Sequence, residues 1–157
     1  MPVSKYVSEV KIIPHKIESV FNYLSNFENI SKYLNEDVLS ALSDKVPQLA
    51  IRNFESDEDS CKFEIGSLGS AEIRIVERNP YTTLKVEGKG GFPIEMKFWI
   101  QLLPVEDNQT KMRLTLHAEM GLMIKMMAGN KLETGINTLA DSLAMLPYGN
   151  ISNQDKR

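Results

Sequence analysis

An amphipathic stretch near the C-terminus most constrains the fold of this chain. Between Gly121 and Leu146 the apolar residues recur every three or four positions, which predicts one apolar stripe on an α-helix. The stripe comprises Ile124, Ala128, Leu132, Ile136, Leu139, Leu143 and Leu146. Pro147 cannot continue the hydrogen-bonding pattern and predicts the end of the helix. Such a helix has to bury its stripe against another layer of structure.

The middle of the chain supplies that layer, because its apolar residues recur with a period of two. Short turn-like gaps separate the runs, so an antiparallel meander with one buried face is predicted. The runs cover residues 49–54, 61–65, 71–75, 82–87, 94–102 and 111–120. We therefore expect an α+β fold in which an antiparallel sheet of about six to seven strands wraps around the long C-terminal helix.

The N-terminal region predicts one more strand and then short helices. Val3 to Ile13 alternates, with Tyr6, Ser8, Val10 and Ile12 on one face. Residues 17–24 and 27–34 have helical spacing and a polar break between them, so two short helices are expected, and a third helical piece is predicted over 36–45.

Length and composition limit the classes of protein that need consideration. The 157 residues suit a single domain, residues 1–148, followed by a polar tail, residues 149–157. A net charge of −3 gives no basic surface for nucleic acid, and no apolar run reaches the roughly 18 residues that stable membrane insertion requires. There is no signal-peptide pattern, and the lone Cys61 cannot form an intramolecular disulfide, so a cytoplasmic location is expected.

The order of these elements resembles the START/polyketide-cyclase superfamily, also called SRPBCC, which has a helix-grip fold. The matching residues are Val10 to Pro14, the end of a strand closed by proline, and Val20 to Asn29, an apolar helix running into a polar turn. Residues 132–143 resemble the family's closing helix. Lys16 departs from the Ser or Asp cap usual there. The resemblance implies a cavity between sheet and helix that holds an apolar small molecule.

Groups able to perform catalysis are few. His15 and His117 have no nucleophilic partner that the sequence places nearby, and both are interpreted as surface residues. Cys61 shares its face with Phe63 and Ile65, which predicts a buried, inert thiol. Two separated histidines and one cysteine form no ligand cluster, so no metal and no cofactor are predicted. Few polar residues face inward, Ser8 and Thr82 foremost, and this scarcity argues against an enzyme.

Glycines and methionines have more than one interpretation. Gly66 to Ser70 and Gly88 to Gly91 lack the helix that a phosphate-binding loop requires, and both predict hairpin turns. Gly129 and Gly135 interrupt the C-terminal helix, either to pack closely on the sheet, which we favour for Gly135, or to let its first turns move. Methionines suit an adaptable apolar pocket but also fill ordinary cores.

Three functions follow as hypotheses. The first is binding or transport of a lipid-like or polycyclic molecule between sheet and helix. The predicted ligand-binding residues are Phe63, Ile73, Ile75, Met96, Phe98, Met112, Leu114, Leu116, Met123, Met127 and Leu132. The second is a cyclase or dehydratase, although no catalytic residue is predicted. The third is a protein–protein interaction module without ligand, in which Trp99 beside Val7 forms a patch that a partner or a second copy in a homodimer could cover.

Overall fold

The computed structural model describes residues 3–31, 51–65, 69–90, 94–106, 108–120 and 122–148. Its elements are, in chain order, β1 (Val3–Val7), β2 (Lys11–Ile13), α1 (Ile17–Leu24), α2 (Phe27–Ser31), β3 (Ile51–Ser56), β4 (Ser60–Ile65), β5 (Gly69–Asn79), β6 (Thr83–Gly90), β7 (Ile94–Glu106), β8 (Gln109–Met120) and α4 (Leu122–Ala144). The predicted helix over 36–45 and the predicted tail, residues 149–157, lie outside the described residues.

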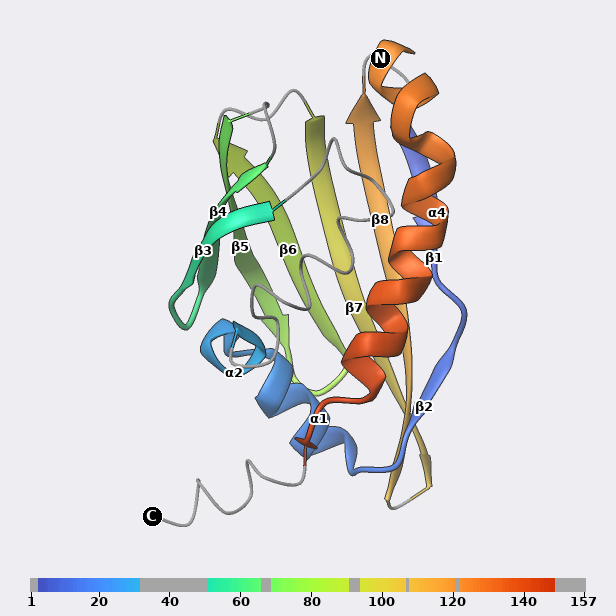
Figure 1. The fold of residues 1–157 in the computed structure, drawn as a ribbon. Helices are drawn as coiled ribbons and strands as arrows, with labels where there is room; N and C mark the ends of the chain where they lie inside the picture. The colour runs from blue at the N-terminus through green and yellow to red at the C-terminus, as the bar shows by residue number, and fades with distance from the viewer. Residues whose placement is uncertain are drawn as a thin grey trace.

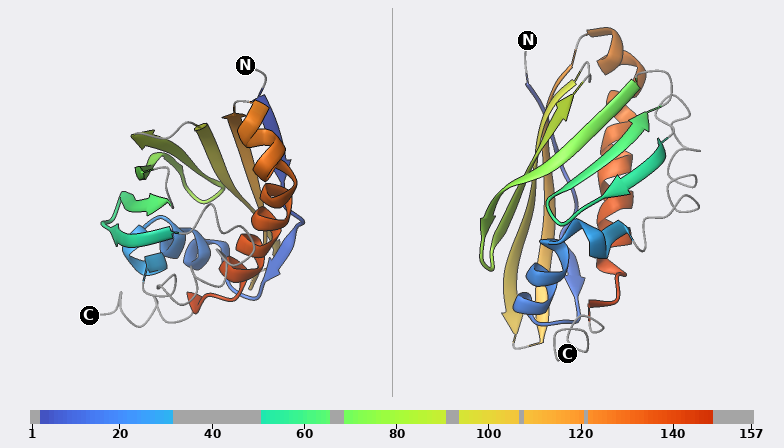
Figure 2. Two further views of the ribbon diagram at one scale, coloured as in Figure 1. Left: turned by 45° about the horizontal axis from the view of Figure 1, so that its top comes forward. Right: turned by 90° about the vertical axis from the view of Figure 1, so that its left-hand side faces the viewer.

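The strands form one antiparallel sheet in the order β1-β8-β7-β6-β5-β4-β3, and β2 also pairs with β8. Helix α4 lies along one face of this curved sheet, over β8 and the N-terminal strands (Figures 1 and 2). The expected α+β helix-grip architecture is confirmed, including the two short helices after the N-terminal strands and the long closing helix. The sheet has one strand more than the six to seven expected, since the predicted first strand is divided in two.

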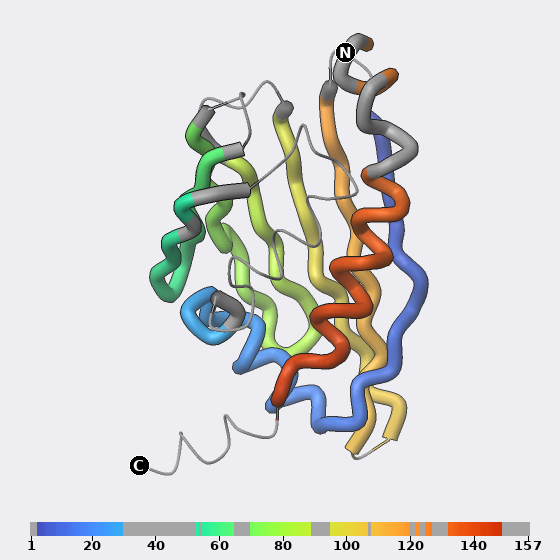
Figure 3. Tube along the Cα trace, viewed as in Figure 1, coloured from blue at the N-terminus to red at the C-terminus, as the bar shows by residue number. Residues whose placement is uncertain are grey.

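The core lies where α1, the sheet and the C-terminal half of α4 meet. In the Cα trace, α1 and the last turn of α4 approach one another at the same end of the sheet (Figure 3). The Tyr23 and Tyr148 rings are in edge-to-face contact there, with 5.1 Å between centroids, and the Tyr148 hydroxyl donates to the Leu143 carbonyl at 2.5 Å. The bond satisfies one of the carbonyls that every helix end leaves unpaired.

An extra residue divides the predicted first strand. Val7 pairs with Thr115, but Lys11 pairs with Met112, so the N-terminal strand has one residue more than β8 between these two pairs. Such a bulge exchanges the two faces of a strand. The prediction that Ile12 shares a face with Tyr6 is therefore wrong, because Ile12 is 48% exposed whereas Ile13 is fully buried.

A second bulge changes the direction of side chains near the end of β5. Ile75 pairs with Val86 and Glu77 with Lys85, which leaves Val76 as the extra residue. Arg78 consequently shares a face with the buried Leu84, and its guanidinium donates to the Ser25 carbonyl at the end of α1 and to Asp59. The arginine thus joins α1, the β3–β4 hairpin and β5.

Candidate functional site

The face of the sheet beneath α4 is unevenly filled. At the α1 end, the inward side chains are almost fully buried: Ile75, Ile100, Leu102, Met112 and Leu114 are at most 5% exposed. Nearer to the start of α4, the inward side chains of the same strands are only half-buried: Ile73, Met96, Phe98 and Leu116. The same change runs along α4, where Ile136 and Ala140 are buried and Leu132 is half-buried.

Small residues occupy the sheet surface at this less filled end. Gly88 and Gly90 of β6 pair with Ile73 and Ala71 of β5, and Ala118 of β8 pairs with Met96. Glycine and alanine raise little or no side chain above the sheet, and longer neighbours occupy the space over Ala71 and Ala118, which are at most 6% exposed. The prediction of a turn over Gly88 to Gly91 is wrong for its first three residues, which continue β6.

The predicted ligand-binding residues come from five elements that face this region. The structure places Phe63 on β4, Ile73 and Ile75 on β5, Met96 and Phe98 on β7, Met112, Leu114 and Leu116 on β8, and Leu132 on α4. Phe63, Ile73, Phe98 and Leu116 pack against the core while remaining partly exposed, whereas Ile75, Met112 and Leu114 belong to the core itself. Met123 and Met127 lie in α4, but their side chains are outside the described part of the structure.

Among the described side chains at the start of α4, two large apolar ones are exposed. Leu122 is 74% exposed and Met126 is 79% exposed. Further along the helix, a Cβ added at Gly135 would meet no atom within 4 Å. The interpretation that Gly135 permits close packing on the sheet is therefore wrong.

Two contacts attach the later turns of α4 to the bulge between β1 and β2. The Glu9 amide donates to Asn137 Oδ1 at 2.7 Å, and Lys11 Nζ lies 2.6 Å from Asp141 Oδ1. The bond to Asp141 raises the pKa of Lys11. These contacts fix the helix at the well-packed end of the core.

The polar residues that sequence reasoning considered lie away from the inward face. His117 pairs with Lys5 and Lys97, on the opposite face from Leu116, and its ring is in edge-to-face contact with Trp99, with 4.7 Å between centroids. Lys85 Nζ lies 5.7 Å from the Trp99 ring centroid. Trp99 is half-buried by these neighbours. Val7 and Trp99 both pair with Thr115, so Trp99 lies in the same cross-strand row as Val7, as expected, and its coverage by a partner stays a prediction.

The remaining polar candidates have structural partners. Ser8 is buried and bonded to Leu114, but Thr82 is exposed, which makes the prediction that it faces inward wrong. Burial raises the pKa of the Cys61 thiol to about 12, with a smaller contribution from Asp57, and confirms the expected inert cysteine. His15 is half-buried beside the Tyr148 ring. In the described ranges, no three His, Cys, Asp or Glu side chains gather so that they could hold a metal ion.

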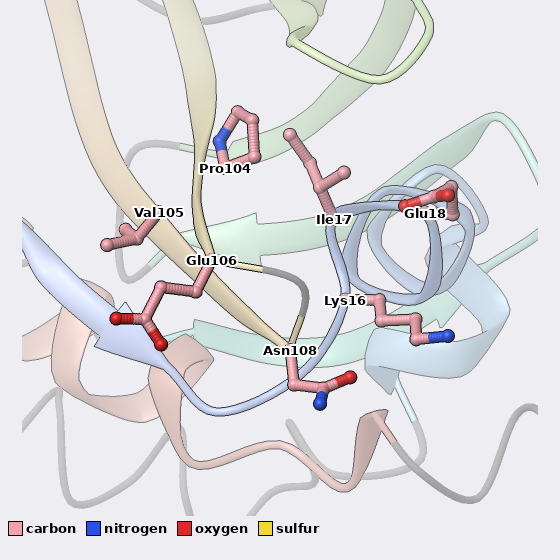
Figure 4. A pocket seen from close by; sticks show the side chains of 7 residues that line it. All are labelled: Lys16, Ile17, Glu18, Pro104, Val105, Glu106 and Asn108. Carbon is pink, nitrogen blue, oxygen red and sulfur yellow. The ribbon is translucent and has the colours of Figure 1, made fainter.

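Two hollows involve residues outside this region, and the second of them also borders it. One, of about 700 Å³, lies between the start of α1 and the β7–β8 hairpin (Figure 4). Its lining residues are Lys16, Ile17, Glu18, Pro104, Val105, Glu106 and Asn108. The other, of about 450 Å³, is lined by Phe63 and Ala71 together with charged residues of β3, β4 and β5. The first contains none of the predicted ligand-binding residues and presents mainly polar groups, so it does not suit an apolar ligand.

Comparisons with known proteins were made for sequence and for structure. No protein-family model matches the sequence, and no curated protein matches it either. Among solved structures, truncated norcoclaurine synthase from Thalictrum flavum is similar with a TM-score of 0.61 and 10% identity, over 93% of this chain and 95% of that chain.

Two bacterial structures are similar as well. A conserved protein from Geobacillus kaustophilus has a TM-score of 0.56 and 19% identity, over 95% of each chain. A START superfamily protein from Mycobacterium smegmatis has a TM-score of 0.52 and 13% identity, over 90% of this chain and 94% of that chain. At such identities the likeness shows the fold and not the function. The structural neighbours are START/polyketide-cyclase (SRPBCC) proteins, and this chain has their helix-grip fold.

Proposed function

We propose that this protein binds an apolar small molecule between its sheet and α4. The observation that carries the proposal is the row of half-buried inward side chains, Ile73, Met96, Phe98 and Leu116, beside glycine and alanine positions of the same sheet. The ligand would contact these residues, and Phe63 and Leu132 would border it. Ile75, Met112 and Leu114 would form its deep side, and Met123 and Met127 would close it from the helix.

Apolar burial would supply most of the binding free energy. A ligand that loses about 500 Å² of apolar surface gains roughly 12 kcal/mol. Association costs at least about 4 kcal/mol, which leaves about 8 kcal/mol and an affinity in the micromolar range. Since the inward face offers few hydrogen-bonding groups, we expect shape and apolar area to select the ligand, a lipid-like or polycyclic molecule that the protein carries or sequesters.

A neighbouring fold provides independent support. Norcoclaurine synthase from Thalictrum flavum has been solved in complex with dopamine and hydroxybenzaldehyde, so the architecture is compatible with small aromatic molecules. A cyclase or dehydratase activity would additionally need an ionisable pair at the ligand. His117 and Glu119, the residues whose inward orientation would favour it, are paired with Lys97 and Glu95 on the opposite face of the sheet. We therefore favour binding over catalysis.

The first experiment is native mass spectrometry of the protein as purified, followed by solvent extraction of any bound species. A stoichiometric apolar molecule would support the proposal. A bare mass at the sequence value, with no uptake from a lipid extract, would contradict it and favour the interaction module.

Matched variants locate the binding region. Gly88→Val adds a side chain on the inward face of β6 and should reduce the fluorescence of added anilinonaphthalene sulfonate. Glu87→Val adds a similar side chain on the other face of the same strand and should leave the fluorescence unchanged. Equal effects would refute the assignment. Met127→Asp tests the helix separately, because an unchanged affinity would show that the start of α4 does not contact the ligand.

A further inference from the structure

Among the described residues, strand β1 is an open edge of the sheet. It is the first strand in the sheet order and pairs with β8 on one side only. Figure 1 shows it at the margin of the sheet, partly behind α4. An open edge of this kind can accept a further strand.

Hydrogen bonds identify which backbone groups face outward. The Ser8 amide donates to the Leu114 carbonyl at 2.9 Å, and Ser8 Oγ accepts from the Leu114 amide at 2.9 Å, so Ser8 faces β8. Backbone direction alternates along an antiparallel strand, hence Tyr6 and Ser4 also face β8. The backbone amide and carbonyl groups of Val3, Lys5 and Val7 then point away from β8, at the edge of the sheet.

One outward group of this series already has a partner. The Glu9 amide, next in the alternation, donates to Asn137 of α4. Within the described part of the chain, the backbone groups of Val3, Lys5 and Val7 have no such partner outside the pairing with β8. Their side chains are exposed as well, Val3 by 52% and Val7 by 41%.

Charge indicates what kind of strand would fit. Lys5 lies in a cross-strand row with His117 and Lys97, and no described carboxylate is within 4.0 Å of its ammonium group. Val3 lies instead in a row with Glu119 and Glu95. An added strand would therefore meet positive charge opposite Lys5 and negative charge near Val3.

A second copy of this chain fits the edge poorly. Antiparallel pairing of β1 with itself over all three outward residues places Lys5 directly against its equivalent, and like charges in that position are destabilising. A shift by two residues avoids the clash but keeps only two of the three outward residues paired with one another. A partner with a carboxylate at the central position avoids both problems.

We propose that β1 binds an extended segment of an acidic partner protein by strand addition. The segment has the pattern apolar, any residue, Asp or Glu, any residue, apolar. Its apolar side chains lie beside Val3 and Val7, and its carboxylate lies beside Lys5. The pattern reads the same in both directions, so it suits parallel and antiparallel addition.

A peptide of sequence Thr-Val-Thr-Glu-Thr-Val-Thr tests the proposal, with Thr-Val-Thr-Lys-Thr-Val-Thr as the matched control. In fluorescence anisotropy, the Glu peptide should bind about tenfold more tightly than the Lys peptide. The variant Lys5→Glu should reverse this preference. Because Lys5 is exposed, the variant should retain the thermal stability of the parent protein.

Hydrogen exchange observed by NMR locates the bound peptide. In the free protein, the Lys5 and Val7 amides should exchange faster than those of Ser4 and Tyr6, and the Glu peptide should slow only the former pair. Equal binding of both peptides, no binding at millimolar concentration, or binding without slowed exchange at Lys5 and Val7 would overturn the proposal. Dimerisation through β1 in sedimentation experiments would assign the edge to a second copy instead.

Discussion

Replacing Gly135 by alanine should stabilise the protein. The residue is in the interior of α4 and half-buried, and a Cβ at this position meets no atom within 4 Å. Glycine in a helix interior costs about 1 kcal/mol relative to alanine, partly because it makes the unfolded chain more flexible. Nothing near Gly135 opposes that gain, so Gly135→Ala should raise the free energy of unfolding by about 1 kcal/mol.

Urea denaturation and a thermal melt measure this change. For a chain of this length, about 1 kcal/mol corresponds to a rise of roughly 2–4 °C in Tm. The control is Thr134→Gly at the adjacent exposed position, which should lower stability by about 0.4 kcal/mol. If Gly135→Ala left stability unchanged or lowered it while Thr134→Gly behaved as expected, the helix would need glycine at this position, and the reasoning from open space would be refuted.

Three further predictions concern single side chains. Asp57 accepts bonds from the Asp59 amide and from the amide and hydroxyl of Ser60, and these lower the pKa of its carboxyl below the ordinary value. In urea titrations, Asp57→Ala should therefore destabilise the protein at neutral pH but have little effect at pH values below the folded pKa, where the carboxyl is protonated. Cys61 should react with a thiol reagent at least about a thousandfold more slowly in the native protein than in urea, because its pKa of about 12 leaves little thiolate. Comparable reaction rates in the two conditions would contradict the burial of the thiol. Lys16 precedes α1 without a side-chain cap. Because a serine hydroxyl can accept from a free amide of the first turn, Lys16→Ser should add about 1 kcal/mol to the free energy of unfolding. An unchanged denaturation midpoint would show that α1 gains nothing from a cap.

The long periodic segments could be predicted from the sequence because each carries many residues of one repeat. Residues 121–146 predicted α4, whose bounds are Leu122–Ala144, and the alternation over 94–102 and 111–120 predicted which face of β7 and β8 is buried. In these elements, a single residue that departs from the repeat does not change the predicted element or its predicted buried face. The half-buried side chains of the candidate site were also on the expected face, since they belong to the same strands.

Single-residue features could not be predicted, because they depend on distant partners. The bulge after β1 is bridged by Ser8, which bonds to Leu114, 106 positions later in the chain. Period-two counting has no means of detecting this extra residue, so Ile12 was placed on the wrong face. Gly135 was misinterpreted for a similar reason, since the space above a glycine depends on the arrangement of the whole sheet.

The bulge after β1 also explains why the two ends of the inward face differ. It places Ile13 in the core and brings Glu9 and Lys11 to Asn137 and Asp141, so that the later turns of α4 are fixed to the sheet. The first turns of the helix instead leave Leu122 and Met126 exposed. The described contacts therefore hold the later turns of α4 against the well-packed end of the sheet. The inward side chains of β7 and β8 are fully buried at the end where these contacts lie and half-buried at the other end.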